Sequence, residues 1–273
     1  MKKSRNIAIV VLVLIILILI LLKIFVGFSG PKLNKPESVV YDPLGQRFLI
    51  SNVGNGSIMA MDDNGNISEF MSQSFAAPKG LVLKDTLLYV TDPTQIHVVD
   101  TQAASIIESY AIAGAIGLND LAFTEENLLY ITDTAGDCVY IYDPVTKAQE
   151  KIINPLLNKP NGIIYDAPRW QMFVVNQSKH SPIISINTKT KEVSIFMDTV
   201  YSNLDGIAID DLGRIYFSSW SEEMIIEIPQ EQNRFITDLK GIQSAADIYY
   251  HKPTNELIVP LLTKDRIQRI PLD

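Results

Sequence analysis

The chain has little sulfur, an excess of negative over positive charge, and few histidines. Cys138 is its single cysteine, which excludes an internal disulfide framework and a cysteine-rich zinc site. Its 23 Lys and Arg residues face 31 Asp and Glu residues, a formal net charge of −8. Nucleic acid is therefore not an expected partner, because phosphate binding requires a basic face. His97, His180 and His251 show no metal-ligand spacing. These absences direct attention to side chains that carry oxygen.

Two widespread functional signatures are also missing. The sequence contains no Gly-x-Ser-x-Gly elbow of the kind that presents a nucleophilic serine between a strand and a helix. It also lacks a glycine-rich phosphate loop on a strand-to-helix turn, and Gly54-Asn55-Gly56 is typical of a hairpin turn instead. A Ser-His-Asp hydrolase is consequently a poor interpretation of this sequence.

The N-terminal segment is distinctly apolar. An apolar run extends from Ile7 to Leu22, is interrupted by Lys23 and resumes over residues 24–28. Its 22 residues would span roughly 33 Å as a helix, enough for a hydrocarbon core of about 30 Å. A cleaved signal peptide is the alternative, but residues 26–30 form a weak cleavage site. The sequence predicts one transmembrane helix, with residues 1–29 as cytoplasmic tip and membrane anchor.

The charges around this segment predict its orientation. Lys2, Lys3 and Arg5 precede the apolar run and are expected to stay in the cytoplasm. The protein is therefore expected to be a single-pass membrane protein with its remaining residues outside the cytoplasm. Setting these three residues and Lys23 aside leaves 19 basic residues against 31 acidic ones, a net charge of −12 that would attract cations.

One short unit recurs along the rest of the chain. Each copy has a turn, one distinctive residue, a small or polar residue and then an apolar strand. The distinctive residues are spaced by 42, 40, 42, 44 and 41 positions. They are Glu37, Lys79, Asn119, Asn161, Asp205 and Ala246. Such a regular period predicts a repeat architecture.

Further short strands follow each copy. Second strands are expected at ranges such as 87–92 and 128–133, third strands at 139–143, and weaker fourth strands at 67–71. Four short strands in 40–44 residues is the period of a propeller blade, and six copies close a ring. A parallel α/β fold would need helical crossovers, for which the sequence gives no pattern. The predicted fold is all-β, a six-bladed β-propeller over residues 36–273.

The last repeat is expected to end after its third strand, at residues 266–271. Its missing outer strand could come from the N-terminal side of the ring. Residues 30–35 are therefore predicted to be a linker that can also act as a closing strand.

The distinctive residues are expected to meet on one axis, because the first strand of each blade lines the central channel. Two carboxylates and two amides would then share a ring with Lys79. Crowded carboxylates favour a compensating cation, and these hard oxygen donors favour Ca²⁺ first, with Mg²⁺ or Mn²⁺ as alternatives. Two other interpretations remain open. The polar residues could only solvate the channel, or the Lys79 ammonium could replace the metal.

The repeats resemble the senescence marker protein/gluconolactonase family of six-bladed propellers, whose relatives include strictosidine synthase-like proteins. The resemblance depends on four segments with matching order and blade: Pro36-Glu37-Ser38, Leu118-Asn119-Asp120, Lys159-Pro160-Asn161-Gly162 and Leu204-Asp205-Gly206. It implies that Glu37, Asn161 and Asp205 hold one divalent cation, and that Asn119 contacts substrate. Lys79 on the axis and the membrane anchor depart from the family pattern.

Two functions are consistent with these observations. The first is a membrane-anchored, metal-dependent hydrolase of a lactone or ester, in which Asp205 is the catalytic base. Asn176 and Trp220 follow second strands, on loops that could contact this small-molecule substrate. The alternative is a non-catalytic, membrane-tethered propeller of the NHL type that binds a protein or a cell-envelope ligand.

Overall fold

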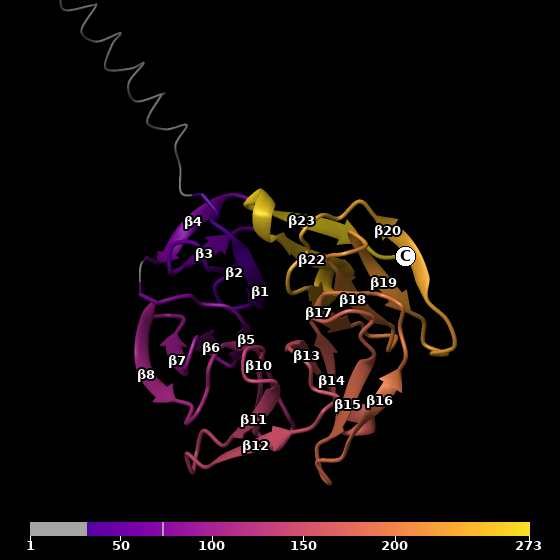
Figure 1. Cartoon of the computed structure of the whole chain (residues 1–273). Coiled ribbons are helices and arrows are strands. Elements are labelled where there is room, and N and C mark those ends of the chain that lie inside the picture. The colour runs from indigo at the N-terminus through magenta and orange to yellow at the C-terminus, as the bar shows by residue number, and fades with distance from the viewer. Residues whose placement is uncertain (1–31, 73) are drawn as a thin grey trace, which may run out of the picture. The chain divides into compact units, whose positions relative to one another are not determined.

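The strands surround a central channel in a ring of antiparallel sheets. A computed structural model describes residues 32–72 and 74–273, and in these ranges six sheets follow one another around the channel (Figure 1). Five sheets have four strands and the last has three, in sequence order from the channel outward. The six-bladed propeller predicted from the repeats is confirmed. The predicted membrane segment, residues 1–29, lies outside the described residues. Within those ranges, no helix is long and apolar enough to cross a membrane.

The first three blades have the following strands. Blade 1 has β1 (Pro36–Asp42), β2 (Arg47–Asn52), β3 (Ser57–Met61) and β4 (Ile67–Met71). Blade 2 has β5 (Leu81–Lys84), β6 (Leu87–Asp92), β7 (Gln95–Asp100) and β8 (Ser105–Ala111). Blade 3 has β9 (Leu118–Phe123), β10 (Leu129–Asp133), β11 (Cys138–Tyr142) and β12 (Gln149–Ile153).

The last three blades complete the ring. Blade 4 has β13 (Pro160–Asp166), β14 (Gln171–Asn176), β15 (Ile183–Asn187) and β16 (Val193–Met197). Blade 5 has β17 (Leu204–Ile209), β18 (Ile215–Ser219), β19 (Met224–Ile228) and β20 (Ile236–Lys240). Blade 6 has β21 (Tyr249–His251), β22 (Glu256–Leu261) and β23 (Arg266–Pro271). Three short 3₁₀ turns are also present in the described ranges: η1 (Ala167–Arg169), η2 (Lys252–Thr254) and η3 (Leu262–Lys264).

Blade 6 begins its first strand later than the repeat predicts. The repeat places a strand from Ala245, whereas β21 starts at Tyr249 and Ala245 forms only an isolated bridge to Leu261. Pro260 lies opposite this stretch in β22, and its carbonyl accepts a hydrogen bond from Ala246 N. Proline has no N–H to return, so the regular ladder cannot continue there.

Hydrophobic clusters between neighbouring blades form the core. In the described part of the chain there are six such clusters, and each combines buried side chains of two adjacent sheets. Between blades 4 and 5, for example, Phe173 packs with Phe217 and Ile226. A single blade could not bury both faces of its own sheet, so stacking around the ring provides the stability.

The first strands carry a β-bulge at the position that matters for the channel. In β1, Pro36 pairs with Asn52 and Val39 with Ile50, so β1 has one residue more than β2 between these two pairs. The same extra residue occurs in β9, β13 and β17. The two bulged residues of each blade are the second and third residues of its repeat. A bulge redirects side chains locally, which explains how successive residues of one strand can both be directed toward the channel.

Hydroxyl groups on the second strands link one first strand to the next. Thr132 Oγ1 accepts from Asp120 N at 2.9 Å and donates to Asn161 O at 2.6 Å. Ser218 makes the same pair of contacts between blades 5 and 6. Blade 4 has Val175 at this position, without a hydroxyl. These contacts fix the spacing of the segments that line the channel.

The ring closes through side chains and single hydrogen bonds. Leu33 is buried in the cluster that includes Ile258 of β22 and Ile267 of β23. Lys35 N donates to Asp265 Oδ1 at 2.7 Å, across the junction of blades 1 and 6. Residues 30–31 lie outside the described residues, and residues 32–35 form no strand in the last sheet.

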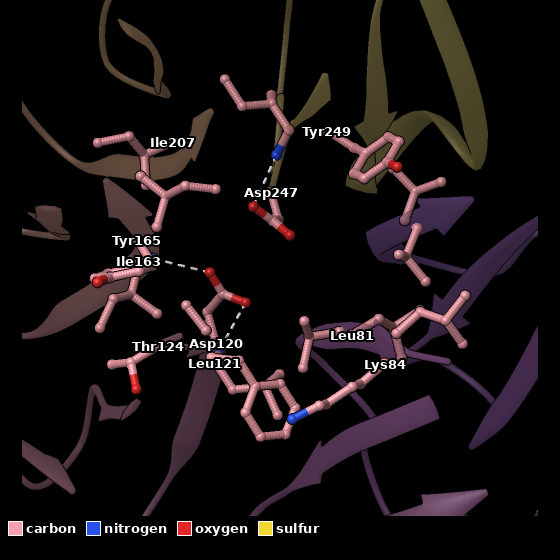
Figure 2. A pocket seen from close by; sticks show the side chains of 18 of the residues that line it. Leu81, Lys84, Asp120, Leu121, Thr124, Ile163, Tyr165, Ile207, Asp247 and Tyr249 are labelled. Atoms are coloured by element: carbon pink, nitrogen blue, oxygen red, sulfur yellow. Dashed lines mark hydrogen bonds between the residues drawn. The ribbon is translucent and has the colours of Figure 1, made fainter. Parts of the chain in front are cut away.

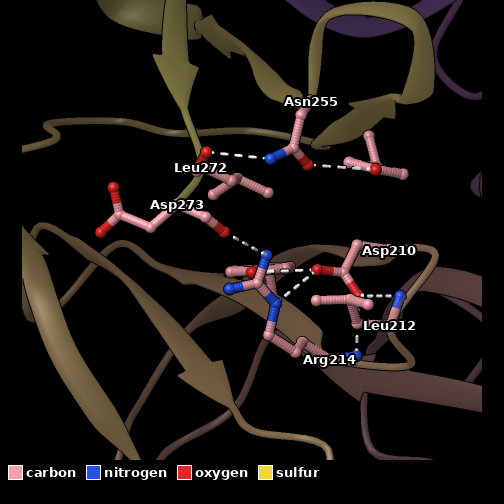
Figure 3. A network of polar contacts seen from close by, with 8 residues as sticks. Asp210, Leu212, Arg214, Asn255, Leu272 and Asp273 are labelled. Carbon is pink, nitrogen blue, oxygen red and sulfur yellow. Dashed lines mark hydrogen bonds and ion pairs between the residues drawn. The ribbon is translucent and has the colours of Figure 1, made fainter.

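The C-terminal residues attach blade 6 to blade 5 (Figure 3). Asn255 Nδ2 donates to Leu272 O at 2.9 Å, and Arg214 Nη2 donates to Asp273 O at 3.3 Å. Arg214 is itself held by Asp210, whose carboxylate also accepts from the Leu212 backbone. This network stabilises the blade that has only three strands in the described ranges.

Candidate functional site

The predicted axial residues lie at one end of the channel, where the first strands begin. We call Glu37, Lys79, Asn119, Asn161 and Asp205 the polar ring. The carboxyl and amide members are 3–5% exposed, and Lys79 is partly exposed. Ala246, in blade 6, brings no polar side chain to this level. Residues up to 168 positions apart in the chain are therefore neighbours, as the repeat predicted.

Asn119 connects the members of the polar ring. With its amide oriented to match its surroundings, Nδ2 donates to Asn161 Oδ1 at 2.9 Å and to Glu37 Oε1 at 3.2 Å. Its Oδ1 accepts from Lys79 Nζ at 3.1 Å and from Thr134 Oγ1 at 3.2 Å. The amide expected to orient a substrate is thus held from both sides by side chains of four blades.

The carboxylates of the ring are buried and incompletely hydrogen-bonded. Glu37 Oε2 and Asp205 Oδ1 have no hydrogen-bond partner among the described residues. Burial raises the pKa of Glu37 well above its usual value; nearby Lys79 lowers it, and Asp205 and Asp247 raise it. Burial likewise raises the pKa of Asp205 to about 7, while Lys79 opposes the shift. Buried oxygens of this kind favour a cation.

Lys79 compensates this charge only in part. Within the described ranges, its ammonium forms no ion pair within 4.0 Å of Glu37 or Asp205. Its contact in the ring is with the Asn119 amide. One ammonium next to two carboxylates leaves the ring with an excess negative charge when both are ionised.

The residues present fit a hard divalent cation. Glu37 and Asp205 offer carboxylate oxygens and Asn161 offers an amide oxygen, the donor types that Ca²⁺ prefers. The described residues contain no group of three or more His, Cys, Asp and Glu side chains arranged to hold a metal ion. The polar ring differs in composition from such a group, because it combines two acids with an amide.

The two loop residues expected to contact substrate differ in their surroundings. The indole N–H of Trp220 lowers the pKa of the Asp205 carboxyl, although Nε1 makes no hydrogen bond of ordinary geometry with the described residues. Asn176 is 1% exposed at the end of β14, and its Nδ2 donates to Leu156 O at 2.9 Å. Asn176 thus holds the loop that leads into blade 4, and its contact with substrate stays a prediction.

A second pair of acids lies in the channel and was not predicted from the sequence. Asp120 and Asp247 are the third residues of repeats 3 and 6 and come from opposite blades. Burial raises the pKa of Asp247 to about 7 and that of Asp120 well above its usual value, with Asp247 as the next cause for Asp120. The repeats do contain a signal for this pair. Position three of the repeats is Ser, Gly, Asp, Gly, Gly and Asp, and copies three apart in a ring of six face each other.

The fold and the polar ring define a class of protein: a six-bladed β-propeller whose channel presents carboxylate and amide oxygens at one end. A sequence model of the SMP-30/gluconolactonase/LRE-like region matches residues 35–240. The chain belongs to this family, which confirms the resemblance found in the repeats. All three strands of blade 6 lie beyond the matched residues.

Solved structures with the same fold have diverse functions. A gluconolactonase from Xanthomonas campestris has 13% identity and a TM-score of 0.74, over 89% of this chain and 87% of that one. Virginiamycin B lyase from Staphylococcus aureus, solved with quinupristin, has 16% identity and a TM-score of 0.68, over 89% and 82%. A chain of a nidogen/laminin complex has 14% identity and a TM-score of 0.69, over 83% and 93%. At these identities the likeness establishes the fold alone. No curated protein matches the sequence significantly.

Proposed function

We propose that this protein is a divalent-cation-dependent hydrolase of lactones or related esters, which acts at the polar ring. The observation that carries the proposal is a pair of buried oxygens, Glu37 Oε2 and Asp205 Oδ1, that have no partner in the part of the chain that the structure describes. They lie beside the bridged amides of Asn119 and Asn161. Family membership supports it. The N-terminal apolar segment is proposed to anchor the enzyme in the membrane with the propeller outside the cytoplasm.

Each ring residue has a proposed role. Glu37, Asn161 and Asp205 would hold the cation, most suitably Ca²⁺, with Mg²⁺ or Mn²⁺ as alternatives. When bound, such a cation polarises a carbonyl group and lowers the pKa of a water molecule. Asn119 would orient the oxygens of the substrate by turning toward them one of its two Nδ2 hydrogens, which otherwise go to Asn161 and Glu37. Asp205 accepts the proton of the attacking water, and Trp220 shields this carboxylate from solvent.

The test is hydrolysis by the purified full-length chain in detergent. Gluconolactone, other lactones and aryl esters are assayed with a chelator and after addition of Ca²⁺, Mg²⁺ or Mn²⁺. Activity should disappear with the chelator, return with one of these ions and fall in Glu37→Gln and Asp205→Asn. Asp211→Asn, which changes an exposed acid paired with Lys252, is the matched control. Hydrolysis that survives the chelator and both ring variants would contradict the proposal.

A second candidate function is non-catalytic binding. It is favoured by Lys79, which places a positive charge in the ring without any added metal. In this case the ring only fills the channel, and exposed loops recognise a protein or cell-envelope ligand. Calorimetry separates the two. One-to-one binding of Ca²⁺ or Mn²⁺ that Glu37→Gln removes supports the hydrolase, whereas no binding together with a specific partner captured from solubilised membranes supports the binding protein.

A further inference from the structure

A large cavity lies at the other end of the channel, where the first strands finish. Its volume is about 460 Å³, within the range of small-molecule sites. None of the polar ring residues lines it. Its walls come from the first strands of blades 1 to 5, the turn after β9, and residues 247–249 of blade 6 (Figure 2). The cavity is therefore a separate site from the one proposed for hydrolysis.

The walls of the cavity are mainly apolar. Every blade contributes at least one aliphatic side chain to the lining. These include Val39, Leu81, Leu121, Ile163, Ile207 and Ile248. Phe123 and Tyr249 add aromatic surface near the opening. Such walls would disfavour a strongly hydrated ion and would favour a ligand with an apolar body.

Two carboxyl groups lie at the inner end of this apolar space. Asp120 and Asp247 come from opposite blades, and Figure 2 shows their side chains directed toward the space between them. Asp120 accepts hydrogen bonds from Leu121 N and Ile163 N, both at 2.8 Å. Asp247 accepts from Ile248 N at 2.9 Å and from Ser38 Oγ at 2.7 Å. Each oxygen has one donor, and a carboxylate oxygen can accept a second.

No side chain of the described ranges neutralises this pair. Neither acid forms an ion pair within 4.0 Å among those residues. Lys84 is the lysine in the lining, but its ammonium is bonded to Asn127 and lies 4.8 Å from the centre of the Phe123 ring. The positive charge of Lys84 therefore lies at the rim, and no cationic side chain of the described ranges compensates the two acids when they are ionised.

We propose that this cavity binds an organic ammonium compound, with the cationic nitrogen between Asp120 and Asp247 and the apolar body against the walls. An inorganic dication fits less well, because Ca²⁺ requires six to eight oxygen ligands and the surrounding walls are aliphatic. An anionic or neutral ligand would leave the two acids uncompensated. The site is independent of the proposed hydrolase activity and goes beyond it.

The experiment is calorimetry on the full-length chain in detergent, with matched blanks of empty micelles. The probe is 2-phenylethylammonium, and 2-phenylethanol is its neutral counterpart of nearly equal shape. We expect the amine to bind one to one. The alcohol should bind at least about 30-fold more weakly, the effect of losing one partner of a buried charge pair.

Two variants test the two parts of the site separately. Asp247→Asn removes one charge, and its amide oxygen can still accept a hydrogen bond from the Ser38 hydroxyl, so the fold should persist. Val82→Trp enlarges a side chain of the cavity wall and keeps both acids in the sequence. Both should weaken amine binding by about 30-fold or more, whereas the surface control Asp211→Asn should not change it.

Three results would overturn this proposal. The first is equal binding of the amine and the alcohol. The second is amine binding that neither Asp247→Asn nor Val82→Trp alters. The third is Ca²⁺ binding that Asp247→Asn abolishes and Glu37→Gln leaves intact, which would assign an inorganic cation to the pair. Because the readout is binding at the cavity, failure of this proposal leaves the lactone assay at the polar ring unaffected.

Discussion

Two acid pairs occupy neighbouring positions of the same repeated unit, yet their surroundings differ. In the polar ring, Glu37 and Asp205 each keep a buried oxygen without a partner among the described residues. One residue further along the repeat, both oxygens of Asp120 and of Asp247 accept hydrogen bonds. The first pair lies beside amides and a lysine, and the second faces an aliphatic cavity. A step of one residue along the repeat thus separates the proposed metal site from the proposed organic-cation site.

The largest expected effect is on lactone hydrolysis, which should depend on the acids of the polar ring and not on the pair Asp120 and Asp247. Asp205→Asn removes both a proposed ligand and the proposed base, so kcat/KM for lactone hydrolysis should fall about 10³-fold. Asp247→Asn changes a carboxylate one residue further along the repeat, which is neither a proposed ligand nor the proposed base, and should leave this rate within about threefold. Steady-state kinetics on both variants, with circular dichroism as the folding control, makes the comparison. An equal loss in the two variants would mean that the ends of the channel do not act separately.

The second prediction concerns stability and pH in the presence of a chelator. Folding raises the pKa of Asp205 and Asp247 from 3.8 to about 7, so the folded chain binds protons more tightly than the unfolded chain. The free energy of unfolding should therefore fall as the pH rises from about 4 to about 7. A shift of three pKa units corresponds to about 4 kcal/mol for one carboxyl, as an upper value.

Urea denaturation at pH 5 and pH 8 measures this trend. His251, whose pKa is lowered by burial, acts in the opposite direction over part of the range. Comparison with Asp247→Asn removes that contribution, because only the carboxyl differs. The variant should show a shallower decline and should be more stable than the parent chain at pH 8. A parent chain that gains stability between pH 5 and pH 8 relative to the variant would contradict the burial of these charges.

The part of the fold and of the polar ring that could be predicted from the sequence is the part that follows the repeat. The repeat of 40–44 residues predicted the blades, and the strands predicted at 67–71 and 266–271 match β4 and β23. The same alignment brought Glu37, Asn119 and Asn161 together in the polar ring. Closure was harder to predict, because Leu33 and Lys35 act through packing and a single hydrogen bond, which have no strand pattern.

The cavity and its two acids could not be predicted from the repeat. Asp120 has the usual features of a turn or strand-entry residue, and its significance comes from Asp247 on the opposite blade. Aliphatic residues such as Leu121 and Ile207 predict a strand equally well whether they fill a core or line an opening. Only the packing of all six first strands determines that a space of about 460 Å³ remains.

A smaller effect is expected from the hydroxyl that links the first strands of blades 3 and 4. Thr132→Val keeps the shape of the side chain but leaves Asp120 N and Asn161 O without their partner. The free energy of unfolding should fall by about 1 to 3 kcal/mol, the cost of unsatisfied buried groups. Cation affinity should weaken a few-fold because Asn161 is less well held. Val175→Thr, at the equivalent position of blade 4, is the reciprocal variant and should not reproduce this loss.

The smallest expected effect tests Lys79, the residue that departs most from the family pattern. Its ammonium contacts the Asn119 amide and lowers the pKa of Glu37 and Asp205. A like charge in the ring opposes a dication, so Lys79→Met should tighten Ca²⁺ binding about fivefold, on the order of the 1 kcal/mol that a unit charge about 4 Å away contributes in a water-like medium. The control is Lys84→Met, which removes a lysine at the cavity and should leave Ca²⁺ affinity unchanged. Weaker Ca²⁺ binding in Lys79→Met would show that the lysine holds Asn119 in place for the cation and does not compete with it.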